Sequence, residues 1–147
     1  MISIQKNDFD LADEYKRLRE QSDSDGAIVT FTGLVRDFSD TGSVSTLFIE
    51  HYPGMTEKTL EAISDKAQQR WDLGQVRIIH RVGYIKADEQ IVFVGVSAKH
   101  RKDAFESAQF IMDFLKNDAP FWKQEGNAQG MQWVDQKQTD IAAAKRW

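Results

Sequence analysis

The chain has 147 residues, of which 41% are hydrophobic and 11% aromatic, and its formal net charge at pH 7 is −4. This length and apolar content predict one ordinary domain with its own core, spanning residues 1–147. The acidic balance argues against general nucleic-acid binding, because neutralising phosphates requires a basic face. The absence of cysteine excludes disulfides, thiolate metal sites, iron–sulfur clusters and a cysteine nucleophile.

The N-terminal stretch MISIQKNDFDLADEYKRL contains no apolar segment of the signal-peptide type. No apolar run in the chain approaches the roughly 20 residues that a membrane-spanning helix requires. We therefore expect a soluble, cytoplasmic protein with no membrane partner.

The first third of the chain alternates strand and helix patterns. Residues 2–6 predict a short strand, and Asp10 can cap a helix over residues 11–21. The segment AIVTFTG predicts a strand over residues 27–32, because Val, Thr and Phe favour extended backbone. VSTLFIEHY predicts another strand over residues 44–52, which we expect to pair with the preceding one as a long hairpin.

A second helix is predicted after the Pro-Gly turn at residues 53–54. It begins at Thr56 and has its apolar residues at helical spacing, and Gly74 lies where a helix terminator is expected. VRIIHRVG then predicts a strand over residues 76–83, and YIKADEQ predicts a turn.

The second half contains the clearest patterns. Residues 91–98 are almost entirely apolar, which predicts a central strand covered on both faces. Residues 102–117 predict a long helix with one apolar stripe that includes Phe105. Pro120 ends that helix, and a polar loop leads to a last short strand over residues 131–135 and a helical turn at the C-terminus. Together these elements predict an α+β fold, a two-layer sandwich with a mixed, largely antiparallel sheet.

Metal and nucleotide sites have little support. The three histidines, His51, His80 and His100, are not paired at helical spacing. The stretch SDSDG lacks the glutamate that a complete calcium loop would place at Thr32. No phosphate-binding glycine loop or serine nucleophile elbow is present. We therefore expect no metal site.

Two sets of cations stand at telling positions. His100 and Arg101 lie between the central strand and the long helix, where free backbone N–H groups and the helix dipole favour an anion. A solvated loop explains the same pair, and position alone favours that interpretation. Arg36 lies in a glycine-bounded loop over residues 33–43, where a functional role and simple solvation are both open.

The stretch FLKNDAPFWKQE carries two lysines, Lys116 and Lys123, around a stiff proline turn. We expect Phe121 and Trp122 to pack onto the body of the protein and thereby to fix the direction of Lys123. In general, a lysine beside apolar walls and a second cation has a lowered pKa and can act as acid or base near neutral pH. The alternative is that both lysines reach water, as most lysines do.

The combined pattern resembles the MoaE family, the large catalytic subunit of molybdopterin synthase. The matching stretches are, in order, DGAIVTFTGLVRD, LFIEHYPGMTEKTL, RWDLGQVRIIHRVG, VFVGVSAKHR, FIMDFLKNDAPFWKQE and AAAKRW. They cover the chain almost completely from about residue 25 to the end. No single stretch is a signature, but their order and spacing are specific.

The resemblance implies an α/β hammerhead-type domain that forms a homodimer. Each subunit binds one small ubiquitin-like sulfur carrier (MoaD-like), giving a heterotetramer. The carrier's C-terminal Gly-Gly thiocarboxylate enters a pocket and gives its sulfur to cyclic pyranopterin monophosphate, also called precursor Z. Two transfers build the molybdopterin dithiolene, and no metal or organic cofactor takes part.

The resemblance also assigns roles to residues. Lys116 and Lys123 correspond to the family's functional lysines. The predicted substrate-binding set comprises Leu34, Val35, Arg36, His100, Arg101, Lys116, Lys123, Gln124 and Glu125. We hypothesise that Lys116 is the principal acid/base group and that Lys123 assists it and holds the pterin or its phosphate. Arg36, His100 and Arg101 would bind the phosphate, in part across the dimer interface.

Three positions depart from the family pattern. Leu34 stands where the TGKVR version of the loop has lysine, Gln124 stands where arginine or lysine is common, and Lys99 replaces a small residue. The rival hypothesis is a non-catalytic module that docks the tail of a ubiquitin-like protein, with the lysines only pairing with that tail.

Overall fold

The computed structural model describes residues 1–20, 24–36, 46–127, 130–133 and 138–147. Its elements in chain order are β1 (Ile2–Gln5), α1 (Leu11–Glu20), β2 (Ala27–Leu34), β3 (Thr46–His51), α2 (Met55–Arg70), β4 (Leu73–Arg81), β5 (Gly83–Lys86), β6 (Gln90–Ala98), α3 (Arg101–Asp118), β7 (Phe121–Asn127), β8 (Gly130–Trp133) and α4 (Gln138–Lys145). No helix among these residues is long and apolar enough to cross a membrane.

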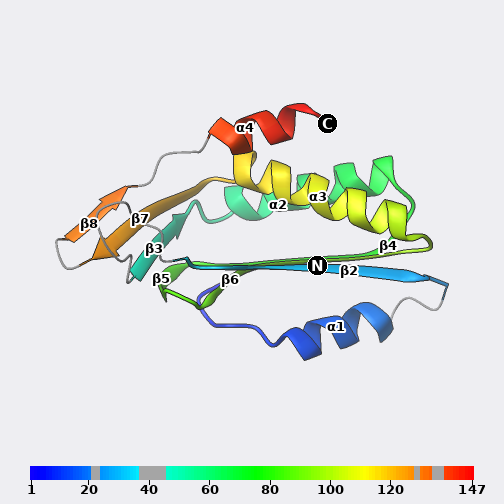
Figure 1. The fold of residues 1–147 in the computed structure, drawn as a ribbon, viewed down its shortest axis with the longest axis horizontal. Coiled ribbons are helices and arrows are strands. Elements are labelled where there is room, and N and C mark those ends of the chain that lie inside the picture. The colour runs from blue at the N-terminus through cyan, green and yellow to red at the C-terminus, as the bar shows by residue number, and fades with distance from the viewer. Residues whose placement is uncertain (21–23, 37–45, 128–129, 134–137) are drawn as a thin grey trace.

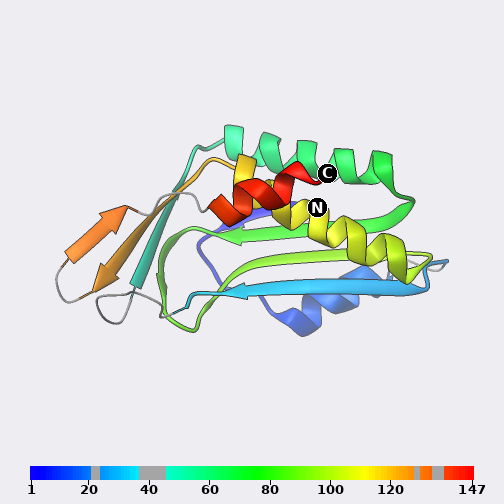
Figure 2. The same cartoon turned by 45° about the horizontal axis from the view of Figure 1, so that its top comes forward.

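The strands form two four-stranded sheets. The main sheet has the order β1-β4-β6-β2, and the small sheet has the order β5-β3-β7-β8. Among the strands that the structure describes, β1 and β4 pair in parallel and the other pairs are antiparallel. Helices α2 and α3 cover one face of the main sheet, α4 lies over α3, and α1 covers the opposite face, while the small sheet extends from one end (Figures 1 and 2). The α+β class and the mixed, largely antiparallel pairing are thus confirmed.

The core forms where the sequence is most apolar. Strand β6 lies between β4 and β2, and residues 91–98 are all buried, which confirms the predicted central strand. The apolar stripe of α3 faces it through Ala104, Ala108, Ile111 and Leu115, because residues three and four apart share one helix face. Phe105 was predicted on this stripe but is 63% exposed, since its position points away from the sheet.

The predicted hairpin between residues 27–32 and 44–52 is wrong. Strand β2 pairs with β6, and β3 pairs with β5 and β7 in the other sheet. The register places Val29 opposite Val96 and Phe31 opposite Val94, so β2 pairs its apolar residues with those of the buried central strand. Residues 44–45 of the predicted strand lie outside the described residues.

Three other local predictions need correction. Residues 84–86 of the predicted turn belong to strand β5, which begins at Gly83, and the turn proper follows at Asp88, whose φ is 72°. The predicted polar loop after Pro120 contains strand β7. Gly74 lies inside β4 and does not end the preceding helix, which ends at Arg70 with Trp71 as its C-cap. A glycine is needed at position 74 because a Cβ there would overlap the Asp25 carboxylate.

The path of α3 decides which residues can meet. Strand β6 runs from Gln90 to Ala98, and α3 begins directly after it and runs back over the same sheet. The register puts Leu34 opposite Gln90 and His80 opposite Val92. The small sheet therefore lies beside one end of the main sheet (Figure 2). This is the end at which α3, β2 and β4 all finish.

Candidate active site

Lys116 lies in the last turn of α3 and is exposed, directly after the buried Leu115. The helix ends at Ala119, whose backbone N–H donates to the carbonyl of Leu115 at 3.3 Å. Pro120 follows, and its carbonyl accepts a hydrogen bond from the Thr56 hydroxyl at 3.3 Å. The turn after Lys116 is therefore tied to the start of α2, as the stiff proline segment predicted.

Phe121 is the aromatic anchor of this segment. Its ring stacks on the ring of His80 with 3.8 Å between centroids and 18° between planes. Trp122 was predicted to pack onto the body as well, but it is 46% exposed. Successive side chains of a strand point to opposite faces, so packing Phe121 inward turns Trp122 outward.

Lys123 lies on the same face of β7 as Phe121, because the two are separated by two positions. Its register partner on β3 is Ile49, which is 1% exposed, so Lys123 belongs to the inner face of the small sheet. Gln124 pairs with Phe48 and lies on the outer face. Gln124 therefore does not share the face of Lys123, although both were predicted to line one pocket.

The two lysines meet electrostatically at His80. This ring is 3% exposed, and its pKa is lowered to about 3, chiefly by burial and next by the charge of Lys123, with smaller effects from Lys116 and His51. A hydrogen bond to the carbonyl of Arg81, which alone would raise the pKa, does not offset these effects. Both lysines therefore direct positive charge toward the same buried, neutral imidazole.

His80 is a residue whose role the sequence did not reveal. It was considered only as a metal ligand, and the spacing of the histidines argued against that role. The available signal was the strand VRIIHRVG, in which His80 follows two buried isoleucines. A polar side chain inside an apolar strand needs a hydrogen-bond partner, and such a position is a candidate for function.

The loop after β2 reaches the same end of the main sheet. Leu34 is exposed, whereas Val35 is buried, and both backbone groups of Val35 bond to the turn after β5. Its N–H donates to the carbonyl of Glu89 at 2.9 Å, and its carbonyl accepts from the N–H of Asp88 at 2.7 Å. These bonds fix the backbone directly before the exposed Arg36, while Val35 itself serves as a core residue.

His100 and Arg101 lie at the opposite end of α3. His100 is the N-cap residue and Arg101 the first helical residue, and both are exposed as the predicted helix-terminus pair. Fifteen residues separate Arg101 from Lys116 within one helix, which corresponds to about 22 Å along the axis. The structure therefore does not bring the His-Arg pair to the lysines of its own chain.

The departures from the family pattern are also placed. The Lys99 ammonium lies 3.9 Å from the Asp72 carboxylate at the far end of α3, so it does not replace a charge beside the lysines. Glu125 of β7 pairs through its backbone with Leu47 of β3. The side chain of Glu125 lies outside the described part of the chain.

The described residues contain no group of three His, Asp or Glu side chains that could hold a metal ion. Within the SDSDG stretch, Asp23 lies outside the described residues, and the Asp25 carboxylate accepts a hydrogen bond from the Ser97 hydroxyl at 2.8 Å.

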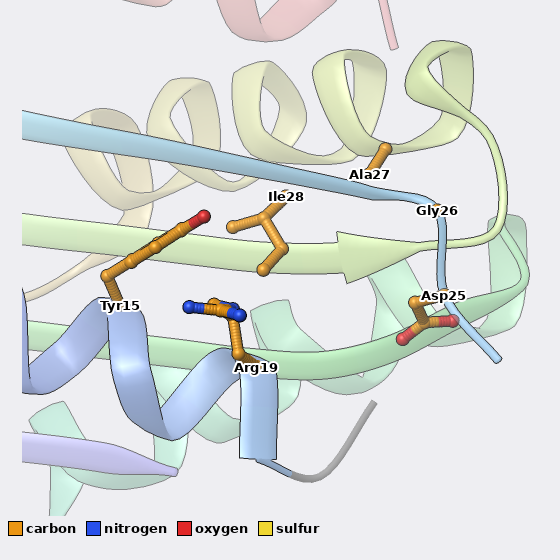
Figure 3. A pocket seen from close by; sticks show the side chains of 6 residues that line it. All are labelled: Tyr15, Arg19, Asp25, Gly26, Ala27 and Ile28. Atoms are coloured by element: carbon orange, nitrogen blue, oxygen red, sulfur yellow. The ribbon is translucent and has the colours of Figure 1, made fainter. Parts of the chain in front are cut away.

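A hollow of about 300 Å³ lies on the α1 side of the main sheet, away from the lysines. Figure 3 shows its lining, with Tyr15 and Arg19 from α1 and residues 25–28 from the start of β2. The Arg19 guanidinium lies over the Tyr15 ring at 5.7 Å. None of the predicted site residues lines this hollow.

Comparisons with known proteins identify relatives of this chain. The family model described as MoaE protein matches residues 4–118. The molybdopterin synthase catalytic subunit of Escherichia coli strain K12 is 51% identical over 146 residues, which cover 99% of this chain and 97% of that protein.

Solved structures show the same fold. The MoaE protein from Burkholderia ambifaria MC40-6 has a TM-score of 0.86 at 48% identity, covering 100% of this chain and 97% of that one. One chain in a complex of subunits 1 and 2 of molybdopterin-converting factor from Helicobacter pylori 26695 has a TM-score of 0.77 at 20% identity, covering 92% and 91%. By the family match, the extent of the identity and the fold, this chain belongs to the MoaE protein family.

Proposed function

We propose that this chain is the catalytic subunit of a cytoplasmic molybdopterin synthase and acts as a sulfurtransferase. Its donor is the C-terminal Gly-Gly thiocarboxylate of a small ubiquitin-like carrier, and its acceptor is precursor Z. In each transfer, sulfur forms a bond to a carbon of the pterin side chain and displaces an oxygen there. Water cleaves the bond between sulfur and the carrier's acyl carbon, so that the carrier is released as a carboxylate. The names of the E. coli relative and of the H. pylori complex support this assignment.

The observation that carries the proposal is that two lysines from different elements lie toward the same end of the main sheet. Both substrates are anions, and the chain has a net charge of −4, so a local cluster of cations is needed to bring them together. Lys116 lies at the end of α3, Lys123 lies on the inner face of β7, and Arg36 follows β2 at the same end of the main sheet.

We assign the acid–base step to Lys116, because its exposed ammonium can reach an incoming tail. Lys123 lies deeper and holds the pterin or its phosphate, while also assisting proton transfer as sulfur adds. Glu125 and Leu34 extend the same binding region in this proposal. Gln124 contributes from the outer face of β7 or not at all, given its register opposite Phe48.

His100 and Arg101 join the site from a second copy of the chain in this proposal. They lie about 22 Å along α3 from Lys116, which is too far for one phosphate to touch both ends. In a two-fold symmetric dimer, one end of α3 can face the other end of its partner's helix. Each pocket would then combine the lysines of one subunit with the His-Arg pair of the other.

The test is a reconstituted reaction of purified protein, thiocarboxylated carrier and precursor Z. Lys116→Ala should slow molybdopterin formation by about 10²–10⁴, the range typical of lost acid–base catalysis. Lys86→Ala on β5 is the matched control, because Lys86 is an exposed lysine on the opposite edge strand of the small sheet. Full activity of Lys116→Ala would remove Lys116 from the mechanism.

Binding of precursor Z tests the phosphate assignment separately. Arg36→Ala and Arg101→Ala should both weaken it, and unchanged affinity in both would refute the assignment. The docking-module hypothesis also predicts carrier binding, so binding alone cannot decide between the two. Only the enzyme hypothesis predicts dithiolene product.

A further inference from the structure

The buried His80 ring packs against the first residue of β7, the strand that carries Lys123. It is the eighth residue of β4 and is 3% exposed, and the Phe121 ring lies flat on it at 3.8 Å. Offset or parallel stacking of this kind fixes both the distance and the tilt of the upper ring. The first residue of β7 is therefore held by the last part of β4, across the junction of the two sheets.

The register of the small sheet puts Lys123 on the stacked face. His51 pairs with Phe121, and Ile49 pairs with Lys123, so these four side chains project from one side of β3 and β7. Lys123 lies two positions after Phe121, which corresponds to about 7 Å along β7. A tilt of Phe121 on His80 would therefore be transmitted directly to Lys123.

The imidazole is itself rigidly held. Its Nδ1 lies 2.7 Å from the carbonyl oxygen of Arg81, and since a carbonyl can only accept, Nδ1 carries the proton of the neutral ring. The Arg81 side chain is fixed in turn by the carbonyls of Lys6 and Gln90 and by the Glu89 carboxylate. The orientation of the His80 ring is thus fixed by groups of the main sheet.

We propose that His80 is a positioning residue of the lysine site, whose neutral ring holds Phe121 and thereby sets where Lys123 lies relative to Lys116. This inference rests on the proposed function for its meaning and goes beyond it, because it assigns a role to a residue that need not touch either substrate.

The chemistry of the position explains why an imidazole suits it. A purely apolar ring could stack on Phe121 but would leave the buried Arg81 carbonyl without its donor, which is costly. A permanently charged side chain would add a cation beside those of Lys123, Lys116 and Arg81. Histidine supplies a flat face and an N–H donor, and it stays neutral between these groups and the neighbouring His51, which pairs with Glu57 at 3.8 Å.

Two substitutions separate the stack from the hydrogen bond. In His80→Asn, the side-chain amide can still donate to the Arg81 carbonyl, but the ring is lost. Phe121→Leu removes the stack from the other side and leaves His80 intact. If the two rings act through one contact, the double variant should lose no more activity than either single variant.

The decisive readout does not depend on activity. The pH dependence of Lys123 acetylation by acetic anhydride, followed by mass spectrometry of the folded protein, reports the surroundings of that amine. We expect the profile of Lys123 in His80→Asn to move toward that of the exposed Lys86, with a change in relative rate on the order of threefold or more. Phe121→Leu should give the same change, while Lys86 itself stays constant.

In the reconstituted reaction, the positioning role predicts a kcat about 10-fold to 100-fold lower. Because Lys123 also holds the pterin, KM for precursor Z should rise no more than it does in Lys123→Ala. An unchanged Lys123 profile and unchanged kcat in folded His80→Asn would overturn the inference. If that variant does not fold, an unchanged profile in Phe121→Leu would overturn it equally. A different outcome is full activity of Lys123→Ala together with a shifted Lys123 labelling profile in His80→Asn. That outcome would refute the proposed role of Lys123 in the reaction and leave the positional link between His80 and Lys123 intact.

Discussion

Acidification should destabilise this chain through His80, and removing that side chain should remove the effect. The pKa of His80 is lowered from 6.5 to about 3 in the folded protein, chiefly by burial and then by Lys123. Below pH 6.5 the unfolded chain binds a proton at this ring, and the folded chain does not until about pH 3. Protonation therefore favours the unfolded state, and the stability contributed by His80 falls as the pH falls through this window.

The size of the effect follows from the width of the window. Each pH unit between the two pKa values costs about 1.4 kcal/mol, so the free energy of unfolding should fall by about 2 kcal/mol between pH 7 and pH 5 through this residue alone. For a chain of 147 residues, that is a fall in Tm of about 4–8 °C.

The assay is urea unfolding of the parent protein and of His80→Asn at half-unit steps from pH 5 to pH 7.5. Other titrating groups, including His51 and His100, remain in both proteins, so the difference between the two pH slopes isolates His80. His100→Asn is the matched control, because His100 is exposed and its removal should leave the slope nearly unchanged. Equal slopes for the parent and His80→Asn would refute the assignment of a neutral, buried His80.

Two further predictions concern the scaffold. Trp147→Ala should lower the free energy of unfolding by about 2–4 kcal/mol in urea titrations, because it removes ring packing and the indole N–H donor to the buried Asp113 at 2.6 Å. Trp122→Ala, at an exposed tryptophan, should cost less than about 1 kcal/mol, and equal losses would contradict this account. Gly74→Ala should cost about 1–3 kcal/mol in thermal unfolding, because its Cβ would overlap the Asp25 carboxylate; an unchanged Tm would contradict it.

Strong local patterns predicted the elements that carry the fold. The apolar stripe of residues 102–117 and the continuous apolar run of residues 91–98 correspond to α3 and β6, which pack on each other. Patterns of this kind are predictable because they express one buried face, whatever the partner.

Strand pairing was not predictable in the same way. Adjacent strands favour hairpins, and this made residues 27–32 and 44–52 look like partners. The observed pairing of β2 with β6 depends on a segment some sixty residues later, and a local pattern cannot contain that information. Strand β7 was missed because FWKQEGN alternates weakly between apolar and polar residues and carries charged residues.

The candidate site was predicted in part. Lys116 and Lys123 are identifiable from their flanks, and the structure supports their grouping around one buried ring. The depth of Lys123 follows from the register opposite Ile49, and the separation of His100 and Arg101 from the lysines follows from the length of α3. Both facts depend on the tertiary structure. A sequence pattern that placed all five cations in one pocket could therefore not show whether they come from one subunit or from two.

The central claim, a site shared between two subunits, can be tested with mixed dimers. Subunits carrying Lys116→Ala and subunits carrying Arg101→Ala are purified together as a mixed dimer with two affinity tags and assayed for molybdopterin formation. If each pocket takes its lysines from one chain and its His-Arg pair from the other, one of the two pockets is intact. Activity should then return to about half that of the parent dimer.

The matched control is a mixed dimer of Lys116→Ala and Lys123→Ala subunits. Both lysines of a pocket come from one chain, so every pocket in this dimer carries one defect, and activity should stay at the level of the parent variants. Recovery in the first mixed dimer and none in the second is the result that the shared site predicts. If the dimer of Lys116→Ala and Arg101→Ala subunits is as inactive as the two homodimeric variants, the shared site is contradicted.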